Sequence, residues 1–266
     1  MSIYSKEQIL FLKKKKKEKH LIIFFQLFIL LLFLASWELL SKYNIINPFL
    51  YSSPSKIIKT IISLFNNKEL FYHIGITIYE VLITFFLASI IGIIIAFILW
   101  NNKILSKIID PYITILNSLP KVALGPLIII WMGARINTII FMALLISLFT
   151  TIINIYQGFI SVNENYLTML KSFKATKLQM FFKVVFPSNI MTILSTLKIN
   201  ISLSLIGVIM GELLVSKKGL GYLIMYGSQM FNLDLVITSI FLLSIISYLM
   251  YIIIDKITVY IEKLSN

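Results

Sequence analysis

Long apolar segments separated by short polar ones make up most of the chain. A helix needs about 20 mainly apolar residues to cross a bilayer. Six segments reach that length, at residues 21–40, 74–100, 111–131, 136–160, 190–215 and 233–254, the start of the third being approximate. The pattern therefore predicts an all-α integral membrane protein with about six transmembrane helices.

The region between the first two apolar segments has a shorter, amphipathic pattern. Its apolar residues recur with the period of a helix, at Ile57, Ile58, Ile61, Ile62 and Phe65. Ser53 or Ser55 is suited to cap such a helix at its N-terminus. We expect residues 54–66 to form an interfacial helix that lies on the membrane.

The longest polar gap inside the apolar region runs over residues 161–188 and is also patterned. One helical stripe consists of Tyr166, Leu167, Leu170 and Phe173, and a second of Leu178, Phe181, Phe182 and Val185. The stripes meet near residues 174–176, so two short amphipathic helices with a turn between them are predicted. Such a loop usually contacts another protein; the alternative is a helical hairpin that lies on the surface without a partner.

The distribution of charge along the chain indicates how the chain is oriented in the membrane. Only 13% of the 266 residues are charged, against about 25% in a typical soluble domain. The net charge is +13, and the lysines fall largely between the apolar segments. If the N-terminus is cytoplasmic, the inner loops hold roughly twice as many basic residues as the outer ones, as the positive-inside rule requires. Six spans then place both termini in the cytoplasm, and membrane lipid, not nucleic acid, is the expected partner of the lysines.

The N-terminal region resembles a secretory signal only in part. Five lysines at residues 13–17 precede an apolar run, but the run continues to Leu40 and no small-residue cleavage site follows. We expect a cytoplasmic Lys-rich segment over residues 1–20, a retained first transmembrane helix over 21–40, and a transmembrane core over 73–255 that contains the loop 161–188.

Catalytic chemistry has little basis in this sequence. The chain has no cysteine, and its histidines, His20 and His73, are far apart. No catalytic, cofactor-binding or metal-binding residues are therefore predicted, and an intramembrane enzyme is disfavoured. The phosphate-binding pattern G-x-x-x-x-G-K-[ST] is absent, so the energy for any transport comes from another subunit or from an ion gradient.

Four segments together resemble a known family. They read PSKIIKTIISLF (54–65), DPYITILNSLPKVALGPLIIIWMGA (110–134), VNENYLTMLKSFKATKLQMFFKVVFPSNIMTI (162–193) and IGVIMGELLVSKKGLGYLI (206–224). In order and spacing they are similar to the binding-protein-dependent ABC importer permeases, in the subgroup of taurine, aliphatic sulfonate and nitrate permeases. The third segment resembles the cytoplasmic "EAA" loop, with Ala175 at the family's Ala and residues 184–187 at its hydrophobic-Pro end.

The resemblance implies the type I ABC importer permease architecture in a bacterial-type inner membrane. It implies a half-transporter that dimerises, as a homodimer in the favoured case and a heterodimer in the alternative. The dimer would bind ABC ATPase subunits, which carry the ATP, and an extracytoplasmic solute-binding protein. The solute would be a sulfonate, nitrate or similar anion, or a vitamin precursor. The residues expected to couple to the ATPase are Glu164, Tyr166, Leu170, Phe173, Lys174, Ala175, Thr176, Phe182 and Pro187.

The EAA-like loop departs from the family pattern at four positions. Residues 168–170 replace the family's Glu-Ala-Ala, and Lys174 replaces a glycine. Because that glycine serves a tight turn, Lys174 either adopts a costly conformation or the turn differs.

Several residues are candidates for lining a transport pathway or forming a gate, and ordinary helix packing is the alternative role for the same residues. The candidates are Pro120, Gly125, Pro126, Ser202, Ser204, Gly207, Glu212, Gly219 and Gly221. Prolines and glycines in a span suggest a broken helix that lines a cavity, but small residues also serve helix packing. For Glu212, hydrogen bonding to the loop 217–222 is favoured over a pathway role.

Three other charged residues within spans also need partners. Lys198 is expected to extend toward the cytoplasm, Lys121 toward an interface, and Glu80 toward a lysine of a neighbouring helix. A stand-alone ion-coupled transporter is the alternative function. It would need a titratable pair near mid-membrane, and Glu80 and Glu212 lie in different spans without evident partners.

Overall fold

The structure, a computed structural model, describes residues 6–265, which form helices joined by short turns and loops, with no strand in that range. Residues 1–5 of the predicted Lys-rich segment lie outside the described residues. The elements are α1 (Lys6–Lys42), α2 (Pro48–Tyr51), α3 (Pro54–Asn66), α4 (Glu69–Asn101), α5 (Lys103–Ser118), η1 (Lys121–Leu124), α6 (Gly125–Met132), α7 (Ile136–Ile160), α8 (Glu164–Ser172), α9 (Lys177–Met180), η2 (Phe181–Val185), α10 (Phe186–Ser188), α11 (Ile190–Val215), α12 (Leu220–Gln229) and α13 (Leu233–Ser265).

The number of spans depends on how one bent region is counted. Within residues 6–265, five helices are long and apolar enough to cross a membrane, or six if the bent pair is one span. The pair is α5 with the segment Lys121–Met132, and the bend is 83°. The third apolar segment, predicted at residues 111–131, is therefore a broken helix, as its prolines and glycines indicated. Leu119 precedes Pro120 and is held extended at ψ 141°, which ends α5 and turns the chain.

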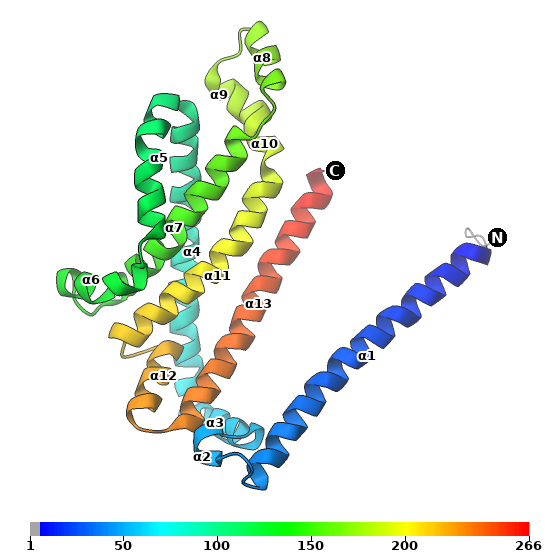
Figure 1. The fold of residues 1–266 in the computed structure, drawn as a ribbon, viewed down its shortest axis with the longest axis vertical. Coiled ribbons are helices and arrows are strands. Elements are labelled where there is room, and N and C mark those ends of the chain that lie inside the picture. The colour runs from blue at the N-terminus through cyan, green and yellow to red at the C-terminus, as the bar shows by residue number, and fades with distance from the viewer. Residues whose placement is uncertain (1–5, 266) are drawn as a thin grey trace.

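Four long helices, α4, α7, α11 and α13, run side by side and form the bundle (Figure 1). Between α7 and α11 the backbones come close because small residues face each other. A Cβ atom added to Gly207 would lie 2.5 Å from the Cα of Ala143, and one added to Gly211 would lie 2.8 Å from a methyl carbon of Ile139. In lipid, apolar side chains gain little by leaving the equally apolar lipid tails, so close van der Waals packing of this kind is what holds the helices together.

Gly207→Ala is expected to lower the apparent melting temperature of the purified protein, since the added methyl group would separate two helices at a cost of about 1–3 kcal/mol. Gly75→Ala is the matched control. Gly75 is also helical, but no described atom outside its own helical turn lies within 4 Å of a Cβ added there. Alanine at this position should be neutral or stabilising, because it favours the helix by roughly 1 kcal/mol. Equal effects of the two substitutions would contradict the close α7–α11 contact.

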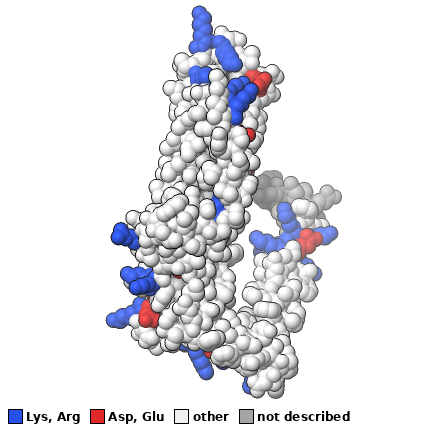
Figure 2. All heavy atoms as spheres, turned by 60° about the vertical axis from the view of Figure 1, so that its left-hand side comes forward, with Lys and Arg blue, Asp and Glu red and all other residues white. Residues whose placement is uncertain are grey.

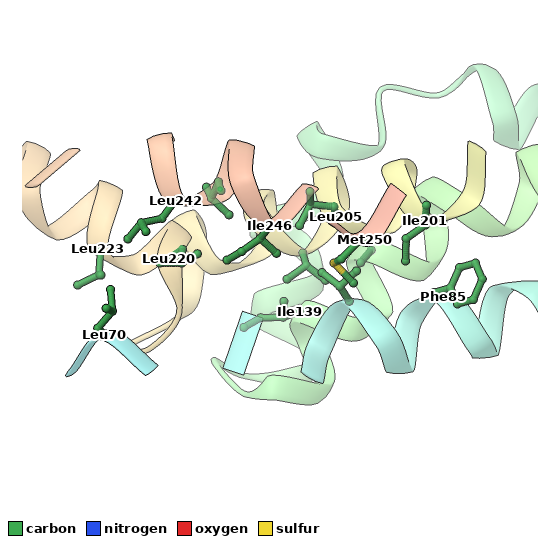
Figure 3. Close-up of a cluster of buried hydrophobic side chains, with 14 of the residues drawn as sticks. Leu70, Phe85, Ile139, Ile201, Leu205, Leu220, Leu223, Leu242, Ile246 and Met250 are labelled. Atoms are coloured by element: carbon green, nitrogen blue, oxygen red, sulfur yellow. The ribbon is translucent and has the colours of Figure 1, made fainter. Parts of the chain in front are cut away.

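Two apolar clusters hold the ends of the bundle. The larger packs α12 against α4, α11 and α13, where Leu220, Leu70 and Leu242 are among the buried side chains (Figure 3). Val81, Val208 and Leu220 are fully buried. The second lies at the other end, where Phe181 of η2 packs against aromatic rings of α4 and α7. The segments that follow α7 and α11 are thus each attached to the bundle by apolar contacts.

Helix α1 diverges from the bundle and meets it only near its C-terminal end (Figure 1). There the backbone N–H of Ser55 donates to the carboxylate of Glu38, at 3.0 Å. The expected helix at 54–66 is present as α3, and Ser53 is the residue that caps it. Helix α1 begins at Lys6, so the described lysines before residue 21 belong to the same helix as the apolar run. Figure 2 shows basic side chains at the top of the molecule, over its lower part and on the free end of α1, with a largely uncharged stretch of the bundle below the top group.

Candidate functional site

The segment between α7 and α11 folds into two short helices joined by a turn, as its two apolar stripes predict. Asn163 caps α8, its side chain accepting from the N–H of Asn165 at 2.9 Å. Thr176 and Gln179 form a reciprocal capping box at the start of α9. The turn between the helices covers residues 173–176. We call residues 161–188 the coupling segment.

Lys174 adopts the left-handed conformation that the family's glycine position requires. Its φ is 58°, a region that residues with a Cβ enter at a cost of roughly 1–2 kcal/mol. Its N–H donates to the carbonyl of Lys171 at 2.8 Å, and the N–H of Ala175 donates to Leu170 at 3.0 Å. These bonds close the C-terminus of α8 in the manner of a glycine cap. Of the two alternatives for Lys174, the costly conformation is the one observed.

Lys174→Gly is therefore expected to stabilise the protein slightly, by about 1 kcal/mol, and to leave the turn unchanged. Lys171→Gly is the control. It removes an exposed lysine from α8 itself, where glycine costs about 1 kcal/mol. Melting temperatures of the two variants should shift in opposite directions. A loss of stability in both would show that the turn does not need a left-handed residue.

The coupling segment exposes large apolar side chains. Tyr166, Phe173, Leu178 and Phe182 are all exposed, and Phe173 keeps 75% of its surface accessible. On α8 the spacing places Tyr166, Met169, Leu170 and Phe173 on one face, and Glu164, Leu167, Thr168 and Lys171 on the opposite one. Exposed aromatic clusters of this kind mark contact sites for other proteins.

The base of the coupling segment is rigidly attached to the bundle. The ring of Phe181 lies 4.5 Å from that of Phe97 and 5.2 Å from that of Phe159, centroid to centroid. Lys177 Nζ donates to the carbonyl of Asn101 at 2.9 Å. Sequence reasoning did not select Phe181 or Lys177 as site residues. The apolar stripe contained Phe181, but nothing local distinguishes its buried ring from the exposed ring of Phe182.

A second polar site joins α4, α11 and the turn before α12. Three successive backbone N–H groups donate to side chains: Gly219 to His73 Nδ1 at 3.0 Å, Leu220 to Thr77 Oγ1 at 2.9 Å, and Gly221 to Glu212 Oε2 at 2.5 Å. The hydroxyl of Thr77 in turn donates to Glu212 Oε1 at 2.7 Å. We call this site the Glu212 turn.

Glu212 has the structural role that the sequence favoured, because both of its oxygens accept hydrogen bonds that hold this turn. Gly219 and Gly221 belong to the same turn. His73 and Thr77 were not selected from sequence, and only their helical spacing on α4 could have indicated a shared face.

The expected pairing of Glu80 with a lysine does not occur within residues 6–265. The Glu80 side chain is fully buried, its carboxyl group lies beside that of Glu212, and no other partner for its oxygens is present in that range. The two residues lie in different helices, and helix packing brings them together. No partner for either acid is evident in the sequence, and only the structure shows that each lies beside the other.

The lysines within the spans find protein partners. Lys198 Nζ bonds Asp255 Oδ1 of α13 at 2.5 Å, so it does not simply extend to the cytoplasm. Lys121 Nζ donates to the carbonyl and the side-chain oxygen of Asn117, both at 3.1 Å, and lies over the ring of Phe149. Each bond lowers the cost of placing an ammonium group at membrane depth.

Packing accounts for several of the candidate pathway residues within a single chain. Gly207 and Ser204 are buried between helices, and Gly125 packs against side chains of Leu214 and Met142. Pro120, Pro126 and Ser202 lie instead on the exposed surface of the chain. Any path that uses these three residues would run along that surface.

Known proteins resemble this chain over most of its length. Residues 88–264 match the family described as "Binding-protein-dependent transport system inner membrane component". The formylaminopyrimidine transport permease protein ThiX of Halalkalibacterium halodurans is 29% identical over 85% of this chain and 90% of its own length. The putative aliphatic sulfonates transport permease protein SsuC of Bacillus subtilis is 25% identical over 81% and 78%.

A solved structure of the MetNI methionine ABC transporter, in an inward-facing conformation, has a similar fold. Its matching chain superposes with a TM-score of 0.62 at 18% identity, over 70% of this chain and 93% of that one. At this identity the likeness concerns the fold alone, and it agrees with the expected type I permease architecture.

Proposed function

Because the chain belongs to the family of binding-protein-dependent transport system inner membrane components, we propose that its coupling segment is the site at which ATPase subunits drive it. The chain is a multi-pass inner-membrane transport subunit of an ABC importer. One observation carries the proposal. A pair of short helices stands at the end of the bundle on a rigid aromatic base, with an apolar face that nothing in the described part of the chain covers (Figure 1).

The chemistry of that face suits a protein partner. Tyr166, Phe173 and Phe182 offer large, exposed aromatic surfaces, and buried aromatic anchors supply much of the energy of protein interfaces. The rings around Phe181 link the coupling segment to α4 and α7, so movement of the docked partner is transmitted to the spanning helices. ATP is bound and hydrolysed on the partner.

Phe173→Asp tests this assignment. Loss of an aromatic anchor costs about 2 kcal/mol or more, so at least a 30-fold weaker complex with the co-expressed ATPase is expected. Co-purification of the two proteins measures it. Phe231→Asp is the matched control, because Phe231 is equally exposed, at 75%, and lies beyond α12, at the other end of the bundle. Undiminished co-purification of Phe173→Asp would refute docking at this face.

The transported solute belongs to a class of small polar molecules that a solute-binding protein delivers. The names of similar permeases support this class, since they specify formylaminopyrimidine, aliphatic sulfonates and taurine. A sulfonate, nitrate or similar anion, or a vitamin precursor, is the substrate. Calorimetric titration of the associated solute-binding protein with these compounds tests the choice, and the absence of binding to all of them would contradict it.

The working unit is a homodimer with both termini cytoplasmic. Helices α5 and α6 carry exposed apolar residues such as Tyr112, Ile130 and Trp131, which a second copy would cover. Pro120, Pro126 and Ser202 then lie near the path between copies. The N-terminal end of α1 and the C-terminal end of α13 both point toward the end of the bundle that carries the coupling segment (Figure 1). A single-chain mass for the purified transporter by light scattering would overturn the dimer.

A further inference from the structure

A cavity of about 720 Å³ lies behind the coupling segment. Its walls are the corner between α4 and α5, the end of α7, and the helices α8 and α9. The aromatic side chains of Trp100, Tyr156 and Phe159 contribute to its lining. It is separate from the Glu212 turn and from the exposed aromatic face, and the proposed transport function does not use it.

The charged residues that line the cavity are mainly basic. Lys103, Lys107, Lys171 and Lys177 line it, against one acid, Glu164. The ion pairs found among the described residues are Lys56–Asp234 and Lys198–Asp255, so none of the four lysines is neutralised by a described carboxylate. One N–H of Lys177 is used by the carbonyl of Asn101. Several ammonium groups around one hollow favour an anion with more than one acceptor oxygen.

The cavity and the exposed aromatic face lie on opposite sides of α8. Glu164, Leu167, Thr168 and Lys171 line the cavity and recur at the spacing of one helix face. Tyr166, Met169 and Phe173 project from the other face. A ligand in the cavity would therefore support α8 from behind while its aromatic face stays free for another protein.

We propose that this cavity binds a phosphate group, supplied by the headgroup of an anionic phospholipid or by soluble phosphate. Basic pockets between spanning helices at the cytoplasmic surface are suited to such headgroups, because the anionic leaflet supplies the ligand at high local concentration. Trp100 and Leu99 add apolar surface beside the lysines, which suits the glycerol and upper acyl part of a lipid. The proposal rests on the cytoplasmic position proposed above for this end of the bundle, and it does not require that the coupling segment binds an ATPase.

The test uses the full-length protein in nanodiscs that contain either phosphatidylcholine alone or a mixture with phosphatidylglycerol. Native mass spectrometry counts the phosphatidylglycerol retained, and hydrogen exchange follows residues 164–173. Retention of the anionic lipid and slower exchange in α8 are expected. In a separate arm, inorganic phosphate is added to the protein in phosphatidylcholine. Slower exchange in that arm alone would assign the site to soluble phosphate.

The double variant Lys103→Gln/Lys171→Gln should weaken retention roughly 10- to 30-fold, since each lysine near the surface contributes about a factor of five. Lys183→Gln/Lys256→Gln is the charge-matched control, because neither residue lines the cavity. Equal losses in the two double variants would reduce the effect to general surface charge and overturn the proposal. So would unchanged retention and exchange in the cavity variant, or no effect of either ligand on the unaltered protein.

Discussion

Gly219→Ala is expected to destabilise the protein by at least about 3 kcal/mol and to abolish transport. Gly219 has a φ of 96°, where a Cβ atom introduces strain of roughly 1–3 kcal/mol. That Cβ would also overlap the carboxylate of Glu212, and overpacking of this kind costs a further 1–3 kcal/mol or so. Displacing Glu212 would leave the N–H of Gly221 without its acceptor. The melting temperature in detergent measures the loss.

Gly133→Ala separates the two causes. Gly133 has a φ of 75°, also in the region that favours glycine, but the nearest atom to a Cβ there is Arg135 Nε at 4.0 Å. The control therefore carries the backbone strain without the overlap, and about half the loss of stability is expected. Equal losses at both positions would mean that contact with Glu212 is not what requires glycine at residue 219.

Glu212→Leu is expected to cause the second large loss. It leaves the N–H of Gly221 without its acceptor, and a buried orphan costs about 1–3 kcal/mol. The hydroxyl of Thr77 loses its short bond to Glu212 and keeps only the longer one to the carbonyl of His73, at 3.3 Å. Because these groups hold the turn before α12, we also expect α12 to detach from the cluster formed with α4 and α13. Faster hydrogen exchange in Leu220–Gln229 would report that change.

Glu80→Leu should have the opposite effect. Among the described residues, the buried carboxyl oxygens of Glu80 have no partner apart from the adjacent carboxyl group of Glu212, so an apolar residue of similar volume removes an unfavourable group. The melting temperature of this variant should be unchanged or higher. If Glu80→Leu proved as damaging as Glu212→Leu, the two carboxyl groups would act as one unit, held together by a bond between them.

The coupling segment shows how far local sequence reasoning reaches. The two apolar stripes and the polar residues between them predicted α8, α9 and the turn at 173–176, because helix period and capping are properties of neighbouring residues. The same reasoning raised the question of Lys174, and its φ of 58° answers it. The stripes could not separate Phe181 from Phe182, since one ring is buried only because α4 and α7 supply aromatic neighbours.

The third span illustrates the opposite case. Its proline and glycine residues predicted an interruption, and Pro120 marks where α5 ends, but the sequence did not determine the size of the bend. The 83° bend depends on α6 packing against α7 and α11, where Gly125 meets Met142 and Leu214. These contacts join residues that are far apart along the chain, so no local pattern contains them.

By itself, the sequence determined the membrane-spanning class, the positions of most helices, the motifs of the family and the place of the coupling segment. Length, apolar content and period suffice for these, because each is a property of one segment. Tertiary structure alone decided that Glu80 lies beside Glu212, that Lys198 pairs with Asp255, and that a basic cavity forms behind α8. Each of these depends on the rotation of the helices about their axes and on the angles at which they cross. Both are set by how small and large side chains fit together between segments that are distant in sequence.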